Sequence, residues 1–169
     1  MPKSLNAKTD TFVIRFAGEK DAAILVALIR ELAEYEKLLD EVTATEALVH
    51  ESIFHRKIAE AIIGDYHGEA VAYAIFFHNF SSFAALPGLF IEDVYVKPHL
   101  RSKGFGKAMF KFLAKLAVER GFARMEWACL DWNAPSIAFY KKMGAEALTD
   151  WTMYRLTGES LAKAAMNQS

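Results

Sequence analysis

The sequence predicts an α/β fold in which helices pack on a mixed β-sheet. One reason is the order of the expected elements, which runs β-α-α-β-β-β-α-β-α-β-α along the chain. Another is composition, because 53% of the residues are hydrophobic and 24% are charged, which suits a buried core. The 169 residues suit one domain, and we expect a loose tail over residues 1–10 and a single domain over residues 11–169.

The first half of the chain begins with a strand and two helices. β-forming residues predict the strand over residues 11–16, and Asp21 is a typical N-cap for a helix that runs to about Tyr35. Thr43 and Glu46 stand three apart, as in a capping box, and predict the start of the second helix. Further β-forming runs predict three strands, over residues 58–63, 70–77 and 89–96.

The second half contains the helix with the clearest periodicity. Its apolar residues from Met109 to Ala117 share one face, lysines recur every four residues on the other, and Gly121 is typical of a helix end. The remaining patterns predict a strand, a short helix, a last strand and a terminal helix, over residues 124–130, 135–142, 149–156 and 158–166.

Charge and cysteine content exclude several classes of partner and site. The net charge is −1, so no overall basic field attracts nucleic acid or an anionic membrane. The single cysteine, Cys129, rules out an intrachain disulfide and a zinc site built on cysteines. The scattered histidines show no metal-ligand spacing, so we expect no metal. We also predict no signal peptide and no membrane span. A lone thiol suits a reducing cytosol, so we expect a cytoplasmic protein.

One segment between a strand and a helix has the residues of a phosphate site. Arg101, Gly104 and Gly106 form the pattern R-x-x-G-x-G, in which glycines let the backbone approach a ligand. The helix start behind them offers unpaired N–H groups and the positive end of the helix dipole. A P-loop is excluded because Ala108 follows Gly106 and Lys107, and the Rossmann pattern is not met either. An ordinary tight turn is an equally good interpretation of the glycines alone.

A second segment lies one strand further along the chain. Asn133 and Pro135 suit a helix start, and Ser136 and Tyr140 share one face of that helix because they are four residues apart. Their polar groups therefore point the same way. An ordinary capped helix with a half-buried Tyr140 explains the same pattern.

Together these two segments resemble the coenzyme-binding core of the GNAT acetyltransferases, whose fold is a mostly antiparallel mixed sheet flanked by helices. More narrowly, the chain resembles the spermidine/spermine (diamine) N-acetyltransferase family, over about residues 11–160. The matching motifs are ELAEYE at residues 31–36, FIED at 90–93, NAPS at 133–136 and FY at 139–140.

The resemblance implies that the chain binds acetyl-CoA as co-substrate. The strand backbone would bind the pantetheine arm, a loop would wrap the pyrophosphate, and polar side chains of the later helix would complete the site. These groups are Val94, Tyr95 and Val96; Arg101, Ser102, Lys103, Gly104, Phe105, Gly106 and Lys107; and Asn133, Ser136 and Tyr140.

The resemblance also implies that Tyr35, Glu36 and Glu92 line the amine site. An alkylamine of pKa ~10.4 is charged at pH 7 and must lose a proton before it attacks, so Glu92 is the candidate acceptor, directly or through water. Tyr140 is the candidate acid for the departing thiolate. Direct attack in a ternary complex needs no covalent acyl-enzyme. Acidic residues cluster where the first helix ends, although a solvated acidic face explains them equally well. The members of this acidic cluster are Glu31, Glu34, Glu36, Asp40 and Glu41.

One feature departs from the polyamine-acetylating members of that family. They have an aspartate in the loop before the strand of Glu92, whereas residues 78–83 contain no acid. This favours a small diamine or diamino acid, such as ornithine or a lysine analogue, over a long polycation. A non-catalytic acetyl-CoA sensor and a protein amine acetyltransferase remain alternatives.

The resemblance further implies a homodimer. Trp151, Met153 and Tyr154 lie in an apolar, aromatic-rich C-terminal portion that could supply a self-complementary surface. Core packing of the same residues is an equally good interpretation.

Overall fold

The computed structural model describes residues 11–166, so the tail predicted for residues 1–10 lies outside the described residues. The chain divides into two compact units, Met1–Ala128 and Cys129–Ser169. The described part of the first unit contains five strands and three α-helices, and that of the second contains two α-helices.

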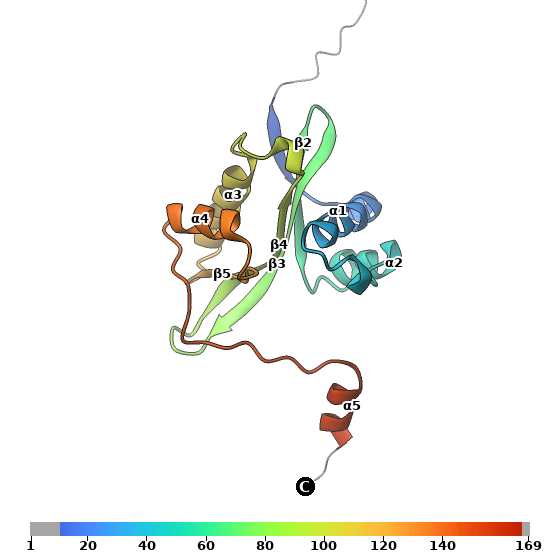
Figure 1. The fold of residues 1–169 in the computed structure, drawn as a ribbon, viewed down its shortest axis with the longest axis vertical. Helices are drawn as coiled ribbons and strands as arrows, with labels where there is room; N and C mark the ends of the chain where they lie inside the picture. Colours follow the sequence, from blue (N-terminus) through green and yellow to red (C-terminus); the bar gives the residue numbers. More distant parts are fainter. Residues whose placement is uncertain (1–10, 167–169) are drawn as a thin grey trace, which may run out of the picture. The chain divides into compact units, whose positions relative to one another are not determined.

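A five-stranded sheet in the order β1-β2-β3-β4-β5 forms the centre of the first unit (Figure 1). Neighbouring strands are antiparallel except β4 and β5, which run parallel. The predicted mixed, mostly antiparallel sheet is therefore confirmed. The strands are β1 (Phe12–Phe16), β2 (Glu60–Tyr66), β3 (Glu69–Ser81), β4 (Leu86–Val96) and β5 (Met125–Trp127).

Helices cover both faces of this sheet. Figure 1 shows α1 (Ala22–Tyr35) and α2 (Glu46–Val49) on one face and α3 (Phe105–Glu119) on the other. A π-helical segment, His50–His55, continues α2. Short 3₁₀ turns occur at Glu19–Asp21, Leu39–Glu41 and Pro98–Leu100.

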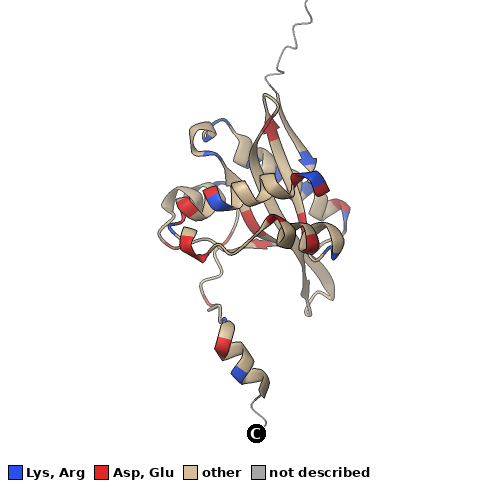
Figure 2. Ribbon diagram, turned by 90° about the vertical axis from the view of Figure 1, so that its right-hand side faces the viewer, with Lys and Arg blue, Asp and Glu red and all other residues tan. Residues whose placement is uncertain are grey.

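Lysine, arginine and acidic residues are distributed over helices and strands alike (Figure 2).

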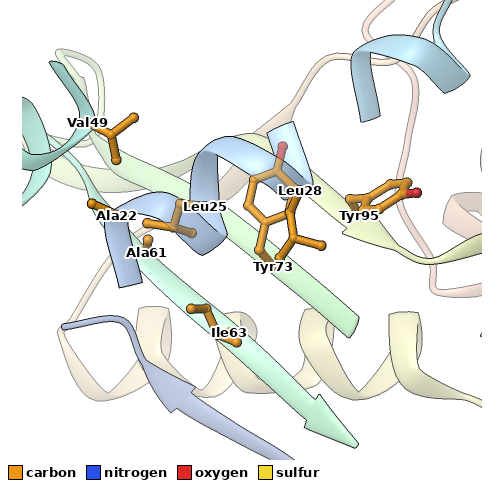
Figure 3. Close-up of a cluster of buried hydrophobic side chains, with 8 residues drawn as sticks. All are labelled: Ala22, Leu25, Leu28, Val49, Ala61, Ile63, Tyr73 and Tyr95. Atoms are coloured by element: carbon orange, nitrogen blue, oxygen red, sulfur yellow. The ribbon is translucent and has the colours of Figure 1, made fainter. Parts of the chain in front are cut away.

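The core beneath α1 joins this helix to β2, β3 and β4 (Figure 3). Leu25, Ile63 and Tyr73 are fully buried in it, and burial of such large side chains is the main driving force for docking α1 on the sheet. The buried members of this cluster are Ala22, Leu25, Leu28, Val49, Ala61, Ile63, Tyr73 and Tyr95. On the opposite face, Met109 and Leu113 of α3 are equally buried, as their helical spacing predicts.

Asp21 precedes α1 as predicted, but its carboxylate does not cap the helix. It accepts hydrogen bonds from the guanidinium of Arg15 at 2.7 and 3.0 Å and from the backbone N–H of Gly18 at 2.7 Å. Arg15 also donates to Asp65 at 2.7 Å. This pair of carboxylates on one guanidinium ties β1 and β2 to the start of α1.

The capping box predicted at Thr43 and Glu46 was wrong. Thr45 is the N-cap of α2, and its hydroxyl accepts from the N–H of Leu48 at 3.2 Å. The reason is that α2 begins at Glu46, so Thr45 directly precedes the first helical residue and reaches the free N–H groups of the first turn.

The predicted strands of the first unit are all present, with shifted ends. β3 and β4 extend the hairpin beyond the predicted loop, so Pro87 lies inside β4, opposite Phe80. β5 is shorter than residues 124–130, because it pairs only with Leu89–Ile91 of β4.

The second unit contains α4 (Ala134–Lys142) and α5 (Gly158–Met166), close to the predicted ranges. The strand predicted over residues 149–156 was wrong, since this segment has no regular secondary structure. A strand needs a neighbouring backbone for its hydrogen bonds, and the described residues of this unit contain no other strand. Its aromatic side chains are exposed, Trp151 by 79% and Tyr154 by 90%.

Candidate functional site

A pocket of about 340 Å³ lies beside the C-terminal end of α1 in the first unit. Glu36 and Glu92, which the sequence analysis assigned to one amine site, line it together. Glu41 and Asp93 add two more carboxyl groups. An acidic pocket with an apolar wall suits a compact organic cation. The apolar part of the wall consists of Ile29, Leu32, Ala33, Leu38 and Val42.

A β-bulge in β4 explains why two consecutive acidic residues line the same pocket. Asp93 pairs with Ile75 and Ile91 pairs with Phe76, so Glu92 has no partner of its own on β3. In a regular strand, adjacent side chains point to opposite faces of the sheet. The extra residue interrupts this alternation and brings both carboxyl groups to the pocket.

The carboxyl groups of the pocket disfavour one another's negative charge. Burial raises the pKa of Asp93 to about 6, and the nearby charges of Glu92 and Glu36 act in the same direction. A hydrogen bond from Tyr73 opposes this rise. Burial also raises the pKa of Glu36. A bound ammonium group stabilises the charged form of such carboxyls, which couples cation binding to their ionisation.

Tyr35 is not among the residues that line this pocket. Its ring lies beneath the guanidinium of Arg101, whose central carbon is 4.1 Å from the ring centroid. Arg101 also donates from Nε to the carbonyl oxygen of Val96 at 3.3 Å. Tyr35 therefore packs against the first residue of the predicted pyrophosphate segment, at the end of the helix that also borders the acidic pocket.

Glu31, another acid of the α1 end, has a structural role. Its carboxylate accepts a hydrogen bond from the hydroxyl of Tyr95 at 3.2 Å and forms an ion pair with Lys97 at 3.1 Å. Glu34 is exposed. The acidic cluster is thus divided, with Glu36 and Glu41 in the pocket and its other members outside it.

The C-terminal half of β4 leaves one backbone edge without a strand partner in the described part of the first unit. β3 pairs with β4 along its length, whereas β5 pairs only with Leu89–Ile91. The free edge therefore belongs to Val94, Tyr95 and Val96. An extended pantetheine arm can add to such an edge as a further strand does.

The loop before α3 has the backbone geometry of an anion site. Ser102 and Gly104 both have positive φ, of 69° and 84°, and Phe105 begins α3 with its free N–H groups. Beyond its own helix turn and chain neighbours, no described atom lies within 4 Å of the place that a Cβ at Gly106 would take. The fold itself therefore does not require glycine at residue 106, and the open space there fits a pyrophosphate. Lys103 and Lys107 add positive charge to this loop and the start of α3.

The predicted residues of the second unit lie at the start of α4 and along it. The side-chain oxygen of Asn133 accepts from the N–H of Ser136 at 3.4 Å, so Asn133 is a helix cap, as its position predicted. Tyr140 follows on the same helix, with its ring centroid 5.7 Å from that of Phe139.

Comparison with known proteins decides the family. The sequence matches the acetyltransferase (GNAT) family over residues 25–145, which is well over half of the chain.

The chain belongs to the GNAT acetyltransferase family.

It is therefore an N-acetyltransferase that uses acetyl-CoA as co-substrate. A thialysine N-epsilon-acetyltransferase from cattle (Bos taurus) is 34% identical over 165 residues, which cover 90% of this GNAT chain and 96% of that protein. An L-ornithine N5-acetyltransferase from Arabidopsis thaliana is 44% identical over 89 residues, 53% of this chain and 39% of that protein. The predicted resemblance to the GNAT superfamily and its diamine acetyltransferases is confirmed.

A solved structure confirms the GNAT fold. An integron cassette protein of V. cholerae superposes with a TM-score of 0.79 at 23% identity, over 92% of this chain and 98% of that one.

Sequence reasoning missed the side chain of Asp93 in this GNAT site. The signal was present, since two adjacent acids, Glu92 and Asp93, interrupt an otherwise apolar strand. In a regular strand the second acid would point to the opposite face of the sheet, and the bulge at Glu92 brings it to the pocket instead.

Elsewhere in the GNAT chain, a second pocket of about 380 Å³ contains none of the predicted site residues and is lined in part by Phe16, Phe54 and Glu60. Within residues 11–166, no three His, Cys, Asp or Glu side chains are grouped as a metal site would require. No helix in that range has the length and apolar character that crossing a membrane demands.

Proposed function

We propose that this enzyme transfers the acetyl group of acetyl-CoA to a primary amine of a small diamine or diamino acid, by direct attack in a ternary complex. The observation that carries the proposal is the pocket lined by Glu36, Glu41, Glu92 and Asp93. Several carboxylates in a partly water-excluded pocket favour a substrate with a second positive group beside the reacting amine. The apolar wall of the pocket suits the short methylene chain between the reacting amine and the second positive group.

Acetyl-CoA fits the residues of this chain that the resemblance assigns to it. The free edge of Val94–Val96 suits the pantetheine arm, and the loop of Arg101–Lys107 suits the pyrophosphate. Asn133 and Ser136 would hold the pantetheine or adenosine side of acetyl-CoA. The family match over residues 25–145 extends past residue 128, which supports one GNAT domain over residues 11–169.

Two side chains move the protons in this proposal. The bound co-substrate supplies the acetyl thioester. Glu92 accepts the proton that the substrate ammonium must lose before attack, directly or through water. Tyr140 donates a proton to the thiolate that departs. The role of Tyr140 rests on the family resemblance, and that of Glu92 also rests on its place in the pocket.

Two observations favour a compact substrate. Residues 78–83, at the end of the β3–β4 hairpin, contain no acid that would anchor the far end of a long polycation. The relatives from cattle and Arabidopsis are named for thialysine and ornithine, which are both diamino acids. We therefore place diamino acids and short diamines before spermine.

A thiol-release assay with acetyl-CoA tests the proposal over a panel of amines. We expect kcat/KM to be higher for ornithine, thialysine or a short diamine than for spermine, a neutral monoamine or a peptide N-terminus. If spermine were the best substrate, the lack of an acid in residues 78–83 would not limit the length of the substrate. If a neutral monoamine or a peptide were the best substrate, the acidic pocket would not be the substrate site. If acetyl-CoA raises Tm but no amine of the panel releases thiol, the proposed substrate class is refuted.

The assembly and location of the protein are part of the same proposal. We infer a homodimer built on the C-terminal segment, because Trp151, Met153 and Tyr154 expose large apolar surfaces there. We infer a cytoplasmic location from the lone cysteine. The proposed partners are a small-molecule amine and a second copy of the chain, without nucleic acid, membrane or metal.

A further inference from the structure

Tyr73 is a polar residue placed inside the apolar core of the first unit. It lies in the middle of β3, fully buried against α1, with Leu25, Leu28 and Ile63 in the same cluster (Figure 3). Phenylalanine fills such a space without introducing a polar group, because a buried hydroxyl must find a hydrogen-bond partner. The partner of Tyr73 is the carboxylate of Asp93, whose Oδ2 accepts from the hydroxyl at 3.1 Å.

The sheet register makes this contact possible. Tyr73 pairs with Tyr95, and Asp93 pairs with Ile75, so Tyr73 and Asp93 are diagonal neighbours on adjacent strands. Diagonal neighbours on one face of a sheet are close enough for a long side chain to bridge. Asp93 is also the residue that follows the bulge at Glu92, and it lines the acidic pocket. One carboxyl group therefore contacts the core through Tyr73 and also borders the pocket.

We propose that Tyr73 is a positioning residue of the amine site, whose hydroxyl fixes the carboxylate of Asp93 at the pocket wall as a charged acceptor for the substrate ammonium. This inference rests on the proposed function. Tyr73 lies behind the pocket wall and does not line the pocket, so it acts through Asp93.

The groups around Asp93 act on its pKa in opposite directions, so the contribution of the Tyr73 hydroxyl can be measured. The groups that face Asp93 are Tyr73 on β3, Glu92 on β4 and Glu36 after α1, with Glu41 in the same pocket. Burial and the two glutamates Glu92 and Glu36 raise the pKa of Asp93, and the Tyr73 hydroxyl is the group that lowers it. The pKa of Tyr73 itself is raised by its burial, so the hydroxyl stays protonated and remains a donor.

The pH dependence of Tyr73→Phe tests the inference. Loss of the donor raises the pKa of Asp93, so the acidic limb of the kcat/KM profile moves to higher pH, by about one unit for a charged hydrogen bond. Phe76→Leu is the matched control, because Phe76 is equally buried on the same strand and has no hydroxyl. It should leave the acidic limb in place, since a merely structural loss does not change the ionisation of Asp93.

A second measurement does not depend on turnover. The carboxyl ¹³C signal of Asp93, followed through a pH titration of the full chain, should show a higher midpoint in Tyr73→Phe than in the parent and in Phe76→Leu. Coincident midpoints in folded parent and Tyr73→Phe would overturn the inference, whatever the activity. A parent that acetylates no amine would instead refute the proposed function, and the titration would still decide the role of Tyr73.

Discussion

Arg15 shows how one residue fixes the start of a helix. Its guanidinium binds Asp21 and Asp65, and the hydrogen bonds from Arg15 hold the pKa of Asp21 below its usual range. A carboxyl whose pKa is lowered by folding stabilises the fold above the pKa of the unfolded chain, and this contribution is lost as pH falls through the folded pKa.

We therefore predict that Asp21→Asn lowers the free energy of unfolding at pH 7 by about 1–2 kcal/mol, a figure reduced because Arg15 is partly exposed. Urea unfolding at pH 7 and pH 3 checks this prediction. The difference from the parent should shrink at pH 3, where Asp21 begins to take up its proton. An equal difference at both pH values would mean that ionisation of Asp21 contributes nothing.

Glu36 is the pocket residue that best separates substrate binding from chemistry. In the proposed complex its carboxylate would contact the cation in both the ground state and the transition state, so Glu36→Gln should raise KM for a diamino acid more than it lowers kcat. Glu34→Gln is a suitable control, because Glu34 belongs to the same helix end but is exposed and does not line the pocket. A fall in kcat alone would instead assign Glu36 to the chemical step.

Tyr140 is the residue whose proposed role is purely chemical. Tyr140→Phe should preserve the fold and the rise in Tm with acetyl-CoA, and turnover should fall by roughly 10²–10⁴, the usual contribution of a general acid. Steady-state kinetics and thermal shifts on the same preparation measure both quantities. Unchanged turnover would show that water or another group protonates the thiolate.

At the scale of elements, the first turn of α3 separates the requirements of the fold from those of the ligand. A Cβ at Gly106 would have open space beyond its own helix turn and chain neighbours, so Gly106→Val should fold like the parent. It should nevertheless block the pyrophosphate, and the rise in Tm that acetyl-CoA gives the parent should disappear. Lys115→Val, an exposed change on the same helix, should keep that rise. Equal shifts in Gly106→Val and the parent would remove this loop from the coenzyme site.

At the scale of the whole molecule, we predict that the C-terminal segment forms the contact between two copies of the chain. We expect light scattering at micromolar concentration to give the mass of a dimer, and Trp151→Glu to shift it toward the monomer, because a charge at a buried apolar contact is costly. Trp151 is 79% exposed in the single chain, so this change should leave the monomer folded. A monomer mass for the parent would end the dimer proposal.

The sequence by itself determined the fold class, nearly every element and the glycine loop before α3. These follow from local rules, as in α3, whose apolar face, glycine loop and Gly121 end are all visible in the order of residues. One exception has a local cause, since Thr45, directly before the first helical residue, is the N-cap and not Thr43. The segment 149–156 has strand-like composition, but strand formation also depends on a backbone partner that sequence composition does not reveal.

Only the tertiary structure decided how the acidic pocket is built. The resemblance assigned Glu36 and Glu92 to one site. Three features of the site could not be predicted from local sequence: the bulge in β4, the contact of Tyr35 with Arg101, and the hydrogen bond from Tyr73 to Asp93. A bulge depends on how two strands align, and a buried hydroxyl depends on which carboxylate lies across the sheet. Both are properties of residues far apart in the chain, which pairing and packing bring together.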